Sequence, residues 1–131
     1  MPRNLALKTL KNVDGAPGQA ERRLESLFSQ NPRLSERDRA LTVHLVQGVL
    51  RWRIRLDWVL KQFVRFPFKK IDPPVLNILR LALFQILFLD RVPESAAVNE
   101  AVKQSRKMGK KHVVKFVNGI LRQICREKDR M

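Results

Sequence analysis

The sequence predicts an all-α fold, a single bundle of six or seven helices around one central apolar helix over 75–89. Twelve of the fifteen residues in this stretch, VLNILRLALFQILFL, are apolar, and only Asn77, Arg80 and Gln85 are polar. At 100° per residue these three lie within a stripe of about 140°, which leaves most of the circumference apolar. The other apolar residues recur at helical spacing, and no hairpin dipeptide lies between alternating segments.

The central stretch reads as a buried helix of a bundle. It exceeds the length of a typical strand, and Leu and Ala outnumber its β-branched residues. It is too short, and carries Arg80 too near its middle, to span a bilayer, so no membrane partner is expected. The preceding Asp72-Pro73-Pro74 is typical of a helix start. Because the apolar surface needs neighbours on several sides, we expect Leu79, Leu83 and Ile86 to be buried almost completely.

Two short helices are expected near the N-terminus, before the central helix, over 3–13 and 19–29. Each places leucines on one side, and the cluster Asp14-Gly15-Ala16-Pro17-Gly18 would end the first. A longer helix follows, for which Ser35 is the expected N-cap with Asp38 three residues later, and it runs to about Trp52.

The remaining helices are expected over 56–65, 95–108 and 111–126. Gly109 would end the helix over 95–108, as glycine often does just after a helix. The helix over 111–126 has an apolar side and a basic side. We therefore interpret residues 1–131 as one domain.

Charge is the main global signal for function. The chain has 27 Lys and Arg against 12 Asp and Glu, a net charge of +15. Residues 1–66 hold 13 basic and 6 acidic residues, and residues 67–131 hold 14 and 6, so the excess is not confined to a tail. This exceeds what solubility requires and predicts a polyanionic partner, nucleic acid before membrane.

A basic surface near the C-terminus is the strongest local candidate for that contact. From Lys103 to Lys115 there are six basic residues and no acid. A solvated helix face usually mixes signs, because like charges one turn apart repel. We call this surface the C-terminal basic face; its residues are Lys103, Arg106, Lys107, Lys110, Lys111, Lys115, Asn118, Arg122 and Arg126.

A second candidate is the arginine patch, Arg51, Arg53 and Arg55. These arginines alternate with Trp52 and Ile54, a composition that suits phosphate contacts beside stacked bases. Trp52 itself is expected to be a core anchor, because the inner residues of its helix lie toward its side.

Asn118-Gly119 lies inside a helical pattern, where Gly costs about 1 kcal/mol relative to Ala. Close helix packing is the explanation we favour for Gly119, ahead of close approach of another backbone or a ligand. Asn118 could contact RNA or merely solvent.

Catalytic and metal-binding motifs are not found. His44 and His112 lie far from each other in sequence and from any acidic or cysteine cluster, and the single Cys125 fits a small core residue in a reducing cytoplasm. No Gly-rich phosphate loop or catalytic triad pattern is present. We therefore expect no catalytic residue, no metal and no cofactor in this chain.

Two stretches resemble the NusB-like RNA-binding family. The first joins Val92-Pro93 and Ala96–Val102 (AAVNEAV) with, after Gly109, Lys115–Arg122 (KFVNGILR), and the second is the central run RLALFQILFL that leads into it. The resemblance covers nearly the whole chain. It implies a helical bundle that binds RNA.

Within that family the upstream part is most similar to the N-terminal domain of bacterial ribosomal-RNA cytosine-5 methyltransferases. Leu34–Leu41, Gly48–Arg53 and Leu56-Asp57-Trp58 carry this similarity. It implies that the domain presents 16S ribosomal RNA to a catalytic domain that binds S-adenosylmethionine and carries catalytic cysteines. This chain stops at Met131 with one cysteine, so we expect either an isolated domain of such an enzyme or a free-standing relative.

The alternatives are a free-standing transcription antitermination factor that acts with a small ribosomal protein, and, from other classes, a DNA-binding or protein-interaction bundle. An exposed apolar patch that dominates over the positive surface would favour the last. The expected location is the cytoplasm, because the first residues lack an apolar signal core.

Overall fold

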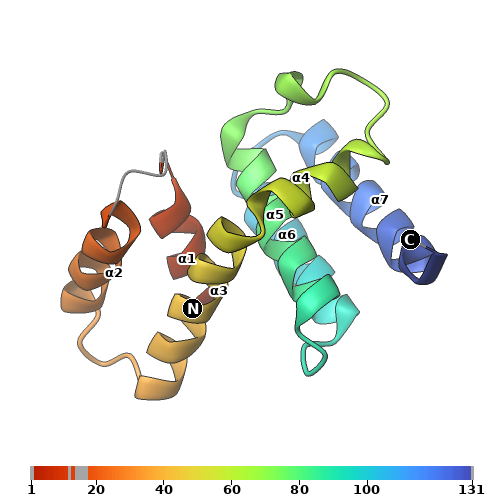
Figure 1. Ribbon diagram of the computed structural model, residues 1–131. Helices are drawn as coiled ribbons and strands as arrows, with labels where there is room; N and C mark the ends of the chain where they lie inside the picture. Colours follow the sequence, from red (N-terminus) through yellow and green to blue (C-terminus); the bar gives the residue numbers. More distant parts are fainter. Residues whose placement is uncertain (1, 12, 14–17, 131) are drawn as a thin grey trace.

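The computed structural model describes residues 2–11, 13 and 18–130, and within them the fold is all-α, as predicted. Figure 1 shows two groups of helices, α1 to α3 on one side and α5 to α7 on the other, with α4 crossing α5. The elements are α1 (Pro2–Leu10), α2 (Gln19–Gln30), α3 (Glu36–Arg51), α4 (Arg53–Lys61), the short 3-10 helix η1 (Phe68–Lys70), α5 (Pro73–Phe88), α6 (Glu94–Arg106), α7 (Lys111–Glu127) and the 3-10 helix η2 (Lys128–Arg130).

Helix α5 is the centre of this arrangement. It packs against α1, α3, α4, α6 and α7, and Leu79 and Leu83 are completely buried, with Ile86 nearly so. Its first residues are Pro73 and Pro74, which fit the first helical turn because the amides there need no helical acceptor. The central position predicted for 75–89 is confirmed. The side chain of Asp72, however, makes no capping hydrogen bond.

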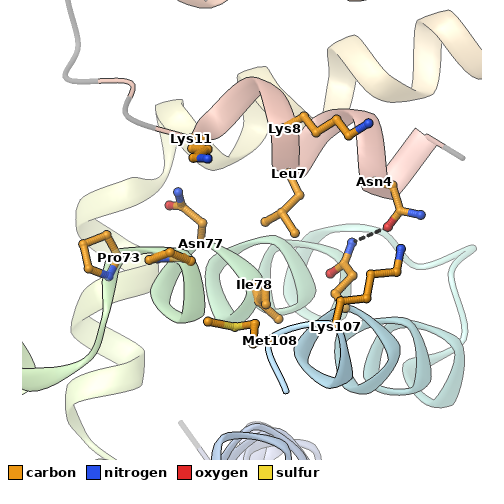
Figure 2. A pocket seen from close by; sticks show the side chains of 11 residues that line it. Asn4, Leu7, Lys8, Lys11, Pro73, Asn77, Ile78, Lys107 and Met108 are labelled. Atoms are coloured by element: carbon orange, nitrogen blue, oxygen red, sulfur yellow. Dashed lines mark hydrogen bonds between the residues drawn. The ribbon is translucent and has the colours of Figure 1, made fainter. Parts of the chain in front are cut away.

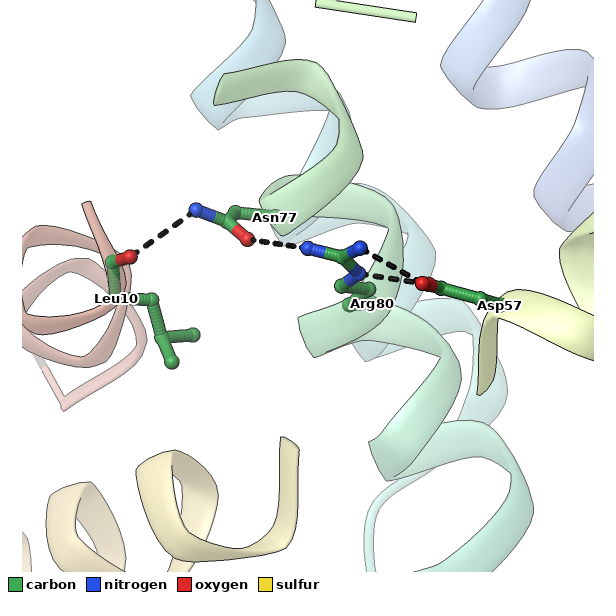
Figure 3. A network of polar contacts seen from close by, with 4 residues as sticks. All are labelled: Leu10, Asp57, Asn77 and Arg80. Atoms are coloured by element: carbon green, nitrogen blue, oxygen red, sulfur yellow. Dashed lines mark hydrogen bonds and ion pairs between the residues drawn. The ribbon is translucent and has the colours of Figure 1, made fainter. Parts of the chain in front are cut away.

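The three polar residues of α5 form hydrogen bonds that position the neighbouring helices α1 and α4. Arg80 donates to both carboxylate oxygens of Asp57 on α4 and to Oδ1 of Asn77 at 3.2 Å, and Nδ2 of Asn77 donates to the carbonyl of Leu10 on α1 at 3.3 Å (Figure 3). One turn from the far end of the helix, Oε1 of Gln85 accepts a hydrogen bond of 2.6 Å from Arg3. The polar stripe of the sequence is therefore a set of tertiary contacts.

Helix α3 approaches α5 closely at the buried Gly48. A Cβ atom at this position would overlap the ring of Phe84 on α5. The glycine therefore sets the distance between α3 and α5.

Two helix boundaries differ from the prediction. Helix α1 ends at Leu10, where Lys11 and Val13 form tighter turns with Lys8 and Leu10. The Asp14–Pro17 part of the predicted turn lies outside the described residues. Helix α4 covers 53–61 rather than 56–65, because Trp52 ends α3 and begins α4 in one step: its N–H donates to Gly48 and its carbonyl accepts from Leu56.

Other local predictions hold. Oγ of Ser35 accepts a hydrogen bond of 3.1 Å from the amide of Asp38, as expected of an N-cap. Gly109 has a φ of 73°, the left-handed conformation that ends a helix. Among the residues described, none of the helices is both long enough and apolar enough to cross a membrane.

Candidate nucleic-acid interface

The C-terminal basic face occupies the solvent side of α6 and α7. Helix α7 buries one side, including Val117 and Leu121, and this fixes the opposite side toward water. The eight lysines and arginines of the face are all exposed, and Asn118 is half-buried. The basic side predicted for this helix is therefore present on the surface.

The face has two ends with different surroundings. Arg106, Lys107, Lys110 and Lys111 gather around the turn at Gly109, because they end α6 and begin α7. Arg122 and Arg126 lie at the other end of α7, beside Glu94 at the start of α6. They line a shallow hollow there with Glu94, Ser95, Val98 and Cys125. The end around the turn therefore carries the more strongly positive surface.

The cations of the face form no ion pair with an acidic residue that the structure describes. Within the described part of the chain, the ion pairs are Arg80 with Asp57 and Lys128 with Glu94, and neither involves the face. Nε of Arg122 donates to Oδ1 of Asn118 at 2.9 Å, which orients the guanidinium along the helix. Uncompensated like charges on adjacent turns cost a few tenths of a kcal/mol per pair, which a bound polyanion would reverse.

Gly119 is not explained by helix packing, and the prediction that favoured packing is wrong. The residue is exposed, and nothing lies within 4 Å of the place that a Cβ atom would occupy. The space next to Asn118 and Arg122 is therefore open to a ligand or to another chain.

The arginine patch spans the junction of α3 and α4. Arg51 and Arg55 are exposed and Arg53 is half-buried. The guanidinium of Arg51 lies 5.7 Å from the ring centre of Trp52, and that of Arg55 lies 4.9 Å from that of Trp58. At these distances the positive charge of each arginine is attracted to the face of the neighbouring ring.

Trp52 is not a core anchor, so that prediction is also wrong. It is 39% exposed and stacks on Phe88 with ring centres 4.9 Å apart. Helical periodicity fails here because Trp52 has a non-helical ψ of 14° at the junction. Trp58 is also exposed, and Ile54 is 88% exposed. We call Trp52, Ile54, Trp58 and Phe88 the aromatic cluster.

The described titratable groups outside these surfaces do not form a metal site. Among the residues that the structure describes, no group of three or more His, Cys, Asp or Glu is placed to hold a metal ion. Burial, together with a hydrogen bond to Glu94, raises the pKa of the Cys125 thiol to about 11. Lys128 forms an ion pair with Glu94 at 2.7 Å and lowers the pKa of this carboxyl.

Comparisons with known proteins give a consistent picture. The model of the NusB family matches residues 1–126. The probable ribosomal RNA small subunit methyltransferase B of Bacillus subtilis (strain 168) is 38% identical over 125 residues, which are 95% of this chain but only 28% of that protein. The transcription antitermination protein NusB of Geobacter sulfurreducens is 32% identical over 127 residues, 94% of this chain and 90% of that protein. A solved structure of the antitermination factors NusB and NusE in complex with dsRNA superposes with a TM-score of 0.82 at 19% identity, covering 95% of this chain and 93% of that one, which establishes the fold.

Proposed function

The chain belongs to the NusB family, and we propose that it is an RNA-binding domain whose C-terminal basic face contacts the phosphate backbone. The observation that carries this proposal is the set of eight exposed cations on α6, α7 and the turn between them, none of which is in an ion pair with a described residue. A surface of this kind binds most favourably to a partner with a regular row of negative charges. Release of the counterions of the nucleic acid would drive the association.

RNA is favoured over DNA as the partner of this chain, because the relatives are named for RNA or were solved with it. The methyltransferase relative is named for ribosomal RNA, and the NusB of similar fold was solved with dsRNA. The net charge of +15 would serve either nucleic acid, so it does not distinguish them.

The finer proposal is that this domain presents 16S ribosomal RNA to the catalytic domain of a cytosine-5 methyltransferase. Its support is the higher identity with the methyltransferase, 38% against 32% with the NusB relative, over similar shares of this chain. S-adenosylmethionine and the catalytic cysteines would belong to that further domain, and the place of action would be the cytoplasm. The alternative is an antitermination factor on nascent transcripts.

A binding experiment tests the proposal on the chain itself. Fluorescence anisotropy would compare a 16S ribosomal RNA fragment, an unrelated RNA and a DNA of equal length at one salt concentration. We expect both RNAs to bind, with the ribosomal fragment tighter. Equal or tighter binding of DNA would contradict RNA as the partner, and no binding of any strand would contradict the nucleic-acid function.

A second candidate function is docking of another protein on the aromatic cluster. Exposed large apolar side chains that lie together usually mark an interaction site, and here Trp52 and Phe88 stack in the open beside Trp58 and Ile54. The structure described with NusE shows that a relative assembles with a protein partner. A small ribosomal protein or the methyltransferase domain would be the partner here, and the arginines would contribute cation–π and polar contacts at the rim.

The two surfaces can be separated by substitution. Trp58→Ala and Ile54→Ala should leave RNA affinity unchanged if the cluster serves a protein. A large loss of RNA affinity in these variants would instead assign the cluster to base stacking.

A further inference from the structure

A cavity of about 330 Å³ lies between α1, α5 and α6, away from the aromatic cluster (Figure 2). Figure 2 shows Leu7 pointing from α1 into this space, toward Ile78 on α5 and Met108 just after α6. Its volume is at the lower end of the range for small-molecule sites, so it accommodates one ring system rather than a long ligand. The floor is apolar, which suits the face of a planar ring.

Polar groups at the edge of the cavity are placed to read such a ring. Gln104 is only 5% exposed, and its Nε2 donates to Oδ1 of Asn4 at 3.2 Å. This leaves Oε1 of Gln104 and Nδ2 of Asn4 without a hydrogen bond to any described residue. Oε1 of Gln104 is therefore an acceptor at the lining of a partly apolar site, and the exocyclic amino group of a nucleobase is a donor that matches it.

The rim of the cavity is basic. Lys8 extends from α1, Lys11 comes directly after α1 and Lys107 directly after α6; all three are exposed, and the residues that line the cavity include no acid. Lys107 also belongs to the C-terminal basic face. A strand whose phosphates lie on that face would therefore pass the mouth of the cavity.

We propose that this cavity takes one unpaired nucleobase of the bound RNA, with the flanking phosphates held by Lys8, Lys11 and Lys107. The proposal rests on the proposed RNA binding and adds a subsite for a single base on the α1 side of the basic face. An apolar cavity with basic residues around it would also suit an acidic peptide, but a volume that fits one ring system and the acceptor of Gln104 favour a base.

The test uses the full chain with two single-stranded oligonucleotides of equal length and charge, one carrying bases and one abasic. Anisotropy should show the strand with bases binding about 5- to 100-fold tighter, the effect expected of one stacked base. Leu7→Trp, which fills the cavity, should remove most of this difference and leave the affinity for the abasic strand unchanged. Leu34→Trp, the same change at another half-buried leucine, should keep the difference.

A second measurement avoids substitution in the bundle. Titration with adenosine monophosphate should shift the side-chain amide signals of Gln104 and Asn4 in NMR spectra, and leave that of the exposed Gln62 in place. Equal binding of the two strands by the unsubstituted chain, or shifts caused by an acidic peptide but not by the nucleotide, would overturn the base subsite while RNA binding stands. Failure of every RNA to bind would overturn both proposals.

Discussion

Arg80 of α5 holds Asp57 of α4 through two parallel N–H···O hydrogen bonds of 2.7 and 2.8 Å. Both side chains are largely buried, 8% and 19% exposed. Because α4 carries Arg53 and Arg55 of the arginine patch, the Arg80–Asp57 pair fixes the orientation of that patch relative to the central helix α5. It also continues through Asn77 to α1, so one polar chain connects three helices (Figure 3).

Removal of the carboxylate should therefore be costly. Asp57→Ala leaves the Arg80 guanidinium buried without its partner, and we expect the free energy of unfolding to fall by about 3–5 kcal/mol. Chemical denaturation measures this. The exposed Asp90→Ala serves as the control, with a change within about 0.5 kcal/mol. Replacing both partners, Asp57→Ala with Arg80→Met, should recover much of the loss, and a double variant no more stable than the single one would argue against the pair as its cause.

Two helical glycines should respond in opposite directions to the same substitution. Gly48→Ala forces a methyl group into the ring of Phe84 and should destabilise the fold by about 1–3 kcal/mol. Gly119→Ala meets open space and should stabilise α7 by about 1 kcal/mol. Melting temperatures of the two variants give the signs. A destabilised Gly119→Ala would contradict the open space beside this face of α7.

The thiol of Cys125 should be slow to react. Because burial and Glu94 raise its pKa to about 11, little thiolate exists at pH 8. Alkylation by iodoacetamide should be at least about tenfold slower than for free cysteine, and should keep accelerating as the pH rises above 9. Glu94→Gln removes the negative charge and should lower the pKa and speed the reaction. A rate at pH 8 equal to that of the chain in guanidinium would contradict this environment.

The sequence alone predicts those features that depend on a single helix. The burial of Leu79 and Leu83 and the basic side of α7 follow from helical periodicity, which is local information. The exposure of Trp52 does not follow from periodicity, because its orientation depends on the junction of two helices, where that periodicity stops. The open space at Gly119 does not follow either, because a glycine in a helix gives no sign of whether a neighbour faces it.

The cavity could not be predicted at all from the sequence. Its lining comes from α1, α5 and α6, and the hydrogen bond between Asn4 and Gln104 joins residues 100 positions apart. Lys8 and Lys11 look like ordinary solvated lysines until the fold places them beside Lys107. The docking of α1 against α5 and α6 therefore determines this site.

A pair of triple variants measures how much the arginine patch contributes to RNA affinity. Arg51→Ala, Arg53→Ala and Arg55→Ala together test the arginine patch, and Arg22→Ala, Arg33→Ala and Arg37→Ala remove the same charge from exposed positions on and near α2 and α3. Each triple variant loses three cations, so differences between them report position rather than net charge. All substituted side chains except Arg53 are exposed, and unchanged melting temperatures would confirm the fold.

A salt titration of RNA binding by the triple variant Lys111→Ala, Lys115→Ala and Arg122→Ala tests the C-terminal basic face most directly. If the face neutralises about four to six phosphates of single-stranded RNA, the slope of log affinity against log salt for the unsubstituted chain should be about −3 to −4. The triple variant should make that slope about two units less negative and weaken every RNA similarly, because phosphate contacts carry no sequence information. An unchanged slope and affinity in this variant, with a loss in the arginine-patch variant, would contradict the face as the RNA contact.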